Sequence, residues 1–180
     1  MRKKLWLALL IGLSLITTAW ADKSETGGSF YYSLISQDPD NLHGYRAALW
    51  YQPGNLIWKH VRVYFDGGMG YWWIANSNPH HSLYIVSLSP VLRYYYRKRY
   101  FLTPFLELSI GLSYLSKTRL ATNNLGMHFA FQDRVGIGAA FGDDKRFSLG
   151  ASAIHYSNAS LCKHNSGMTI PLLVTLGYRF

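Results

Sequence analysis

The sequence has little cysteine, few acidic residues and no apolar run long enough for a membrane helix. Its single cysteine, Cys162, cannot form an internal disulfide, and we interpret it as a residue without a functional role. After the N-terminal segment, no stretch approaches the roughly 18 apolar residues that a membrane helix needs. Lysine and arginine number 18 against 9 acidic residues, but these charges are scattered over turns and do not form one cluster. This distribution argues against a nucleic-acid partner.

The N-terminal 21 residues have the three parts of a secretory signal peptide. Arg2, Lys3 and Lys4 supply the positive start, the apolar segment 5–16 is too short to cross a bilayer, and residues 19–21 read Ala-Trp-Ala, a cleavage site. We therefore expect residues 1–21 to be removed and residues 22–180 to form one domain. Export without a helical anchor leaves a soluble protein or a barrel in an outer membrane.

Alternating apolar and polar residues, punctuated by turn residues, indicate β-strands throughout the mature chain. The pattern predicts eight of them, at 27–36, 44–51, 60–74, 82–96, 101–115, 126–141, 146–158 and 168–180. An even number of long strands is typical of a closed barrel in an outer membrane. The fold class we predict is therefore all-β, an eight-stranded antiparallel outer-membrane β-barrel.

The faces of these strands favour a membrane barrel over a soluble one. Glu107 and Arg179 lie opposite the apolar face of their strands, which indicates a polar lumen and an apolar outer wall. Strict alternation in segment 168–180 places Ile170 on the apolar face and Thr169 on the opposite one. The clusters at 71–73 and 94–96 are typical of aromatic girdles at the membrane interfaces.

Two polar residues interrupt the apolar face of segment 146–158. His155 and Ser157 are two residues apart, so their side chains share that face, and the imidazole can accept the proton of a nucleophilic hydroxyl. Asn158 offers an amide donor for an oxyanion. In the neighbouring strand Asp133 also falls in an apolar stripe, where a charge facing lipid is costly. A register slip at a bulge would instead turn all of them into the lumen as ordinary lining.

The motif His155-Tyr156-Ser157-Asn158-Ala159 resembles the active-site signature of the lipid A 3-O-deacylase (PagL) family. Further similar motifs occur in family order, and the resemblance covers essentially the mature chain. They are His81-Ser82-Leu83, Pro104-Phe105-Leu106-Glu107, Ile110-Gly111, Leu125-Gly126 and Phe131-Gln132-Asp133-Arg134-Val135-Gly136.

The resemblance implies an outer-membrane barrel that hydrolyses the ester of the acyl chain at position 3 of lipid A. It implies that Ser157 is the nucleophile and His155 the general base, with an oxyanion hole from the Asn158 side chain and the backbone N–H at Ser160. Asp133 matches the aspartate that contacts the hydroxyl of the substrate acyl chain. The implied partners are lipid A or lipopolysaccharide and the outer membrane, with a homodimer possible. No metal or other cofactor is implied.

Two departures from the family pattern are visible. Ser160 stands where the family has glycine, which is less suitable if that position needs a positive φ. Thr169 stands where the third triad member should be an acid, and Asn165 is the other local candidate to orient His155. Weak activity, or a structural or adhesive barrel without catalysis, therefore stays open as an alternative. An acyltransferase is a third possibility.

Two further candidates are a basic turn and a pair of adjacent histidines. The turn residues Arg97, Lys98 and Arg99 can either hold lipid A phosphates or be a solvated turn. His80 and His81 are adjacent, so in a strand they point to opposite faces, and we do not expect a metal there.

Overall fold

The chain forms a closed antiparallel β-barrel with a short two-stranded ribbon beside it. The structure is a computed structural model that describes residues 24–35, 39–75, 80–96 and 101–180. Its elements are β1 (Glu25–Ile35), β2 (Leu42–Gln52), the 3-10 turn η1 (Gly54–Leu56), β3 (Val61–Ile74), β4 (Ser82–Tyr95), β5 (Leu102–Leu115), β6 (Arg119–Leu120), β7 (Asn123–Asn124), β8 (Phe129–Phe141), β9 (Phe147–Ser157) and β10 (Met168–Arg179).

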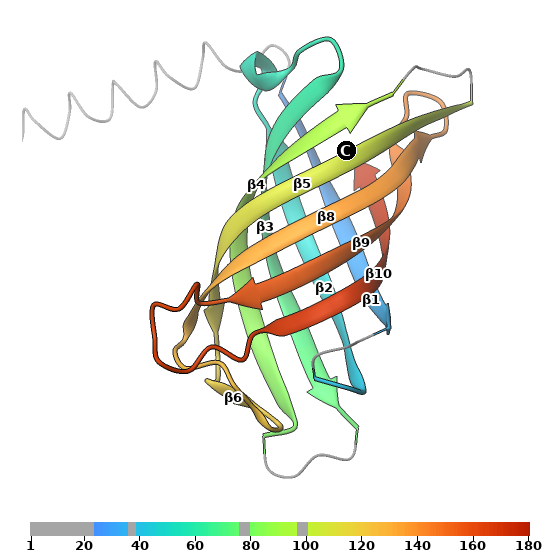
Figure 1. Ribbon diagram of the computed structural model, residues 1–180. Helices are drawn as coiled ribbons and strands as arrows, with labels where there is room; N and C mark the ends of the chain where they lie inside the picture. The colour runs from blue at the N-terminus through green and yellow to red at the C-terminus, as the bar shows by residue number, and fades with distance from the viewer. Residues whose placement is uncertain (1–23, 36–38, 76–79, 97–100) are drawn as a thin grey trace, which may run out of the picture.

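Eight of these strands close the barrel in the order β1-β10-β9-β8-β5-β4-β3-β2, while β6 and β7 pair only with each other (Figure 1). Each neighbouring pair is antiparallel, and β1 closes the sheet by pairing with β10. The prediction of an eight-stranded antiparallel barrel is confirmed. No helix long and apolar enough to cross a membrane occurs in the ranges that the structure describes.

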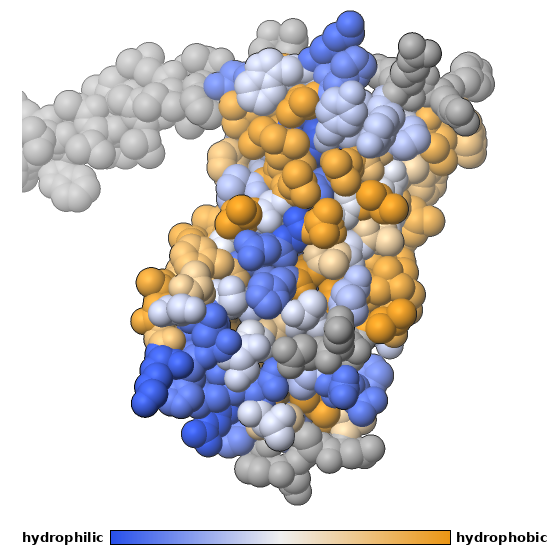
Figure 2. All heavy atoms as spheres, viewed as in Figure 1, coloured by the Kyte–Doolittle hydropathy of each residue, from blue (hydrophilic) through white to orange (hydrophobic). Residues whose placement is uncertain are grey.

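The barrel is apolar outside and polar inside. Ile110 and Ile137 are 69% and 63% exposed on the outer wall, whereas Glu107 and Arg134, on the same strands, are 5% and 3% exposed in the lumen. Apolar side chains cover much of the wall between two more hydrophilic ends (Figure 2). Because a soluble barrel would bury its apolar face, this arrangement is that of a barrel surrounded by lipid.

The lumen is filled in two layers. Near the start of β10, apolar side chains form a plug that includes Trp72, Leu83, Ile154, Tyr156 and Ile170, each 0–1% exposed. A polar network fills the lumen on the other side of this plug, toward the end of β10.

In that network, Asp66 lies between the guanidinium groups of Arg46 and Arg134. Glu107 accepts hydrogen bonds from Tyr64 and Arg93. Because these charges are paired, they can be buried in the lumen without leaving the barrel an open channel.

The two ends of the barrel differ in the length of their connections. The two longest, 116–128 and 158–167, lie at the end opposite the C-terminus (Figure 1), which we call the loop end. Outer-membrane barrels have short periplasmic turns and longer extracellular loops, so we infer that the loop end faces outward. The expected signal peptide, residues 1–21, lies outside the described residues.

Both ends carry aromatic rings on the outer wall. Tyr71 stacks on Trp73 at the loop end with ring centroids 5.4 Å apart, and Tyr94 meets Tyr96 edge to face at 5.2 Å at the other end. The predicted girdles need one correction. Trp72 is fully buried in the plug and Tyr95 lines the lumen, because alternate side chains of a strand point to opposite faces.

Candidate active site

A row of three polar side chains crosses the outer wall near the loop end. The strand register pairs Asp133 of β8 with His155 of β9, and His155 with Thr169 of β10. Directly paired residues lie on the same face, with Cβ atoms about 4.5–5.5 Å apart. All three are half-buried, whereas the neighbouring Gln132 and Tyr156 are fully buried in the lumen. The row therefore faces out of the barrel, and the alternative in which these residues line the lumen is wrong.

A β-bulge in β10 brings Thr169 into this row. The pairing of β10 with β9 shifts between Ile170 and Leu173, and Pro171, which has no backbone N–H, lies inside the shift. The strict alternation predicted for segment 168–180 is therefore wrong at its start. Ile170 is fully buried in the plug, and Thr169 faces outward beside His155.

The imidazole of His155 is held from the β10 side. Its Nδ1 atom lies 2.8 Å from Thr169 Oγ1, within hydrogen-bond distance. With Nδ1 engaged, Nε2 is the ring nitrogen left for a proton transfer. Of the two candidates to orient His155, it is Thr169 that makes the contact.

Ser157 is the last residue of β9 and lies two positions after His155 on the outer face. It is half-buried and pairs with Phe131 of β8. Within the described residues its hydroxyl makes no hydrogen bond, so it is not committed to a structural partner. Ser157 and His155, the predicted nucleophile and base, are thus neighbours on one wall, without the close contact that such pairs often form only when substrate binds.

The Asn158 side chain has a different position from the one predicted for an oxyanion donor. It is 1% exposed, and its Nδ2 atom donates to the carbonyl oxygens of Leu125, at 3.0 Å, and His164, at 2.8 Å. An amide group has two hydrogens, and both are used. The predicted role of the Asn158 side chain is therefore corrected, because in this geometry it ties two loops together.

The turn after Asn158 leaves backbone donors free. Leu161 N donates to Asn158 O at 3.0 Å, and the two residues between them, Ala159 and Ser160, have φ of +51° and +63°. This is the φ pattern of a type I′ turn. The N–H groups of Ala159 and Ser160 have no acceptor in the part of the chain that is described. Ser160 does occupy a backbone conformation that favours glycine, as the departure from the family pattern suggested.

A third positive-φ residue, Gly167, packs against His155. Its φ is +71°, and a Cβ at this position would lie 3.2 Å from Cε1 of His155 and 3.3 Å from the carbonyl oxygen of Tyr156. Gly167 ends an Asn-Ser-Gly turn that is visible in the sequence just before Thr169. Asn165, in the same turn, accepts a hydrogen bond from the backbone N–H of Asn158 at 2.9 Å.

The wall behind the row is held by contacts inside the barrel. Tyr156 donates to Gln132 Oε1 at 3.0 Å, and Gln132 donates to Ser89 Oγ at 3.1 Å. Because Tyr156 and Gln132 are chain neighbours of His155 and Asp133, these bonds fix the two strands beneath the row. Such support holds catalytic side chains in place before substrate binds.

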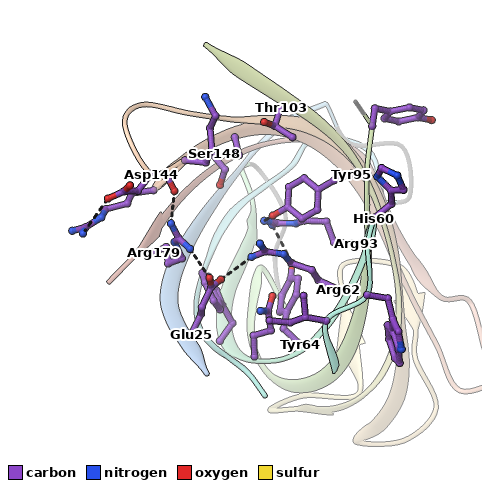
Figure 3. Close-up of a pocket in the computed structure, with 18 of the residues that line it drawn as sticks. Glu25, His60, Arg62, Tyr64, Arg93, Tyr95, Thr103, Asp144, Ser148 and Arg179 are labelled. Carbon is purple, nitrogen blue, oxygen red and sulfur yellow. Dashed lines mark hydrogen bonds and ion pairs between the residues drawn. The ribbon is translucent and has the colours of Figure 1, made fainter. Parts of the chain in front are cut away.

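The lumen also contains a cavity of about 640 Å³, but it lies at the end away from this row (Figure 3). Glu25 bridges Arg62, at 2.8 Å, and Arg179 across its mouth, and Arg93 lies beside Tyr95. It opens inside the barrel rather than on the wall that meets lipid. Of the two places, only the His155 row lies on the face that meets lipid.

The remaining candidates are a basic turn and a pair of histidines. The turn residues Arg97, Lys98 and Arg99 lie outside the described residues. No group of three or more potential metal ligands occurs in the described part of the chain. His80 has a φ of +69° and lies before β4 begins.

The sequence is similar to one family over most of its length. A family model described as Lipid A 3-O-deacylase (PagL) matches residues 42–179. Lipid A deacylase PagL of Pseudomonas aeruginosa is 32% identical over 173 residues, covering 93% of this chain and 94% of that protein. The protein of the same name from Bordetella bronchiseptica is 27% identical over 164 residues, covering 91% and 88%.

Solved structures give the same result for the fold. The crystal structure of the outer membrane enzyme PagL matches with a TM-score of 0.71 and 28% identity, over 84% of this chain and 98% of that one. Neisserial surface protein A matches with a TM-score of 0.58 over 87% and 97%, at 11% identity. The second likeness shows a shared barrel fold alone.

Proposed function

The chain belongs to the lipid A 3-O-deacylase (PagL) family, and from that premise we propose how its outer wall performs the reaction. The protein is an outer-membrane enzyme that hydrolyses an ester-linked acyl chain of lipid A. The proposal concerns which residues carry the chemistry. It is supported above all by the row of Asp133, His155 and Thr169, with Ser157 beside it, on the face that meets lipid.

In the first step, Ser157 Oγ attacks the ester carbonyl while Nε2 of His155 accepts the hydroxyl proton. The tetrahedral intermediate then collapses, the bond to the sugar oxygen breaks, and His155 returns the proton to that oxygen. The acyl chain is now esterified to Ser157. A water molecule, deprotonated by His155, then attacks this ester. The bond between the acyl carbon and Ser157 Oγ breaks, His155 returns the proton to Ser157 Oγ, and the 3-hydroxy fatty acid is released.

Thr169 is the positioning residue for His155, in place of the acid of a complete triad. A carboxylate only accepts hydrogen bonds, so it would force the proton onto Nδ1 and leave Nε2 free to act as base. A hydroxyl both donates and accepts, so it holds the ring without selecting one tautomer. It also offers no charge to the imidazolium that forms during attack. We therefore propose a working but slow enzyme.

The oxyanion is bound by backbone N–H groups of the turn that follows Ser157. Ala159 and Ser160 provide two free donors there, while the Asn158 amide holds the turn in place through Leu125 and His164. Backbone donors held by a tight turn need no reorganisation during the reaction.

The acyl chain lies along the small side chains of the outer wall. Ala151 and Ala153, half-buried before His155 on the same face, leave room for it between β8 and β10. Asp133 is then next to the start of that chain, where its carboxylate can accept a hydrogen bond from the 3-hydroxyl group. This contact would select hydroxylated chains over plain ones.

The test uses the purified full-length protein with lipid A in detergent micelles, and the products are analysed by mass spectrometry. We expect a free 3-hydroxy fatty acid, and we expect Ser157→Ala to lower the rate by about 10⁴-fold or more. Ser148→Ala, a serine of the same strand that lines the lumen, is the matched control. Equal rates for Ser157→Ala and the wild type would overturn the mechanism. The homodimer stays a prediction, to be tested by chemical cross-linking in membranes.

A further inference from the structure

The two longest connections join into one rigid surface beside the nucleophile, which we call the loop shelf (residues 116–128 and 158–167). Asn123 Nδ2 donates to Gly167 O at 3.2 Å, and Ser166 N donates to Asn124 O at 3.1 Å. The Asn158 amide reaches across to Leu125. The shelf starts directly after Ser157 and ends at Gly167, which packs on His155.

The shelf is also anchored in the barrel. Leu120 and Leu125 are 0% and 5% exposed and belong to the apolar plug of the lumen. Its buried residues and its cross-links therefore hold the backbone of the two segments in place beside Ser157.

The charges of the shelf are all of one sign. It carries Lys117, Arg119 and Lys163, and neither segment contains an aspartate or a glutamate. Hydrophilic side chains gather at this end of the molecule (Figure 2), where Figure 1 draws β6 and the connection between β9 and β10.

Arg119 differs from every other arginine that the structure describes. Arg46, Arg62, Arg93, Arg134, Arg146 and Arg179 each form an ion pair with a carboxylate. Arg119 has no such partner within the described ranges, and neither do Lys117 and Lys163. An unpaired guanidinium in a fixed loop favours binding of an external oxyanion, because its planar donors fit a phosphate group in pairs.

We propose that the loop shelf is a phosphate-binding site that holds the phosphorylated sugar of lipid A while its ester lies at Ser157. This proposal rests on the proposed function and adds the recognition of the headgroup to it. Arg119 makes the paired contact, and Lys163 and Lys117 add charge. The sugar is thereby fixed over the row, so the cations raise the affinity for phosphorylated substrate without entering the chemical step.

Rates are compared for lipid A with its phosphates, for dephosphorylated lipid A and for a small neutral p-nitrophenyl ester. For Arg119→Gln and Lys163→Gln we expect kcat/KM to fall roughly 10- to 100-fold on phosphorylated lipid A, mainly through KM. The other two substrates should lose much less. Lys59→Gln, a lysine at the opposite end of the barrel, is the control. An equal loss on all three substrates indicates a structural role and overturns the proposal, as does no loss on any.

A binding measurement tests the loop shelf independently of the proposed catalytic mechanism. Ser157→Ala protein in nanodiscs is titrated with both forms of lipid A and, separately, with inorganic phosphate. We expect at least 10-fold tighter binding of the phosphorylated form, reduced by Arg119→Gln, and only weak binding of free phosphate. Equal affinity for both forms of lipid A overturns the shelf. If the wild type hydrolyses no ester but this preference persists, the mechanism fails and the shelf stands.

Discussion

Replacing Thr169 by glutamate tests the missing acid of the active site directly. Thr169 Oγ1 lies 2.8 Å from His155 Nδ1, so a carboxylate at this position can take over the same contact. It would hold the proton on Nδ1 and place a negative charge beside the imidazolium that forms when Ser157 is attacking. We expect the glutamate variant to be faster than the wild type.

The size of the gain follows from the change in the hydrogen bond. A bond between neutral groups contributes about 0.5–1.5 kcal/mol and one to a charged group about 1.5–3 kcal/mol, a difference of roughly 1–1.5 kcal/mol. A charge about 4 Å away at an effective dielectric constant near 20 contributes up to about 4 kcal/mol. Both energies describe the same interaction and are not added, so the gain lies between about 1 and 4 kcal/mol, which predicts a rise in kcat of roughly 5- to 1,000-fold.

The assay is the initial rate of fatty acid release from lipid A, with two matched variants of the same residue. Thr169→Gln has the shape of glutamate without its charge, so the ratio of the two rates isolates the charge. Thr169→Val replaces the hydroxyl by a methyl group of similar size, and we expect this variant to be slower than the wild type. If the glutamate variant is no faster than the glutamine variant, or if Thr169→Val equals the wild type, Thr169 does not position His155.

Three further predictions concern backbone strain and buried charge. Gly167→Ala should lower kcat and cost roughly 1 kcal/mol or more of stability. The control is Gly142→Ala, at a φ of +83° with a Cβ that would lie 3.2 Å from Cδ2 of Phe147, and it should lower stability alone. Measurements of kcat and of thermal unfolding on both variants check this. Ser160→Gly should raise stability by up to about 1 kcal/mol, because the left-handed conformation costs more for serine than glycine loses in chain entropy; an unchanged or lower Tm contradicts this. Asp66→Asn leaves two buried guanidinium groups with a neutral partner, so the free energy of unfolding in urea should drop by about 3–5 kcal/mol; a drop below 1 kcal/mol would refute the network's role.

Most of the barrel can be predicted from the sequence because a strand has a period of two. Long alternating segments fix both the number of strands and which face meets lipid, and the outer position of His155 and Asp133 follows from the same count. The position of Thr169 does not, because a bulge adds one residue to β10 and reverses the faces before it. Pro171 is the visible sign of that bulge, but a proline alone does not give the side on which the register shifts.

The hydrogen-bond partners of the Asn158 side chain could not be predicted in the same way. Its amide bonds reach Leu125, which is 33 residues away in the chain, and His164 in the following loop. Which of several polar groups meets a side chain depends on how two loops pack, and alternation within a strand carries no information about that. The same holds for Arg119. That it has no carboxylate partner among the described residues can be seen only in the structure, where the other described arginines each form an ion pair.

The depth of the row explains how a barrel can carry the polar groups of the proposed site on a wall that faces lipid. His155 lies two residues before the end of β9, which at about 3.3 Å per residue and a tilt near 40° is roughly 5 Å below that end. At the midplane of a bilayer a charged side chain on the lipid face costs about 2–4 kcal/mol, but near the interface the cost falls to about 0–1 kcal/mol.

The same depth is the one at which a lipid headgroup is joined to its acyl chains. A row placed further down β9 would cost more to insert and would face methylene groups instead of an ester. A row placed beyond the strand would lose the backing of Tyr156 and the plug. The end of β9 therefore satisfies three requirements together: a low cost of insertion, a rigid support and access to the ester. The loop shelf, which begins at the next residue, is then at the level of the sugar.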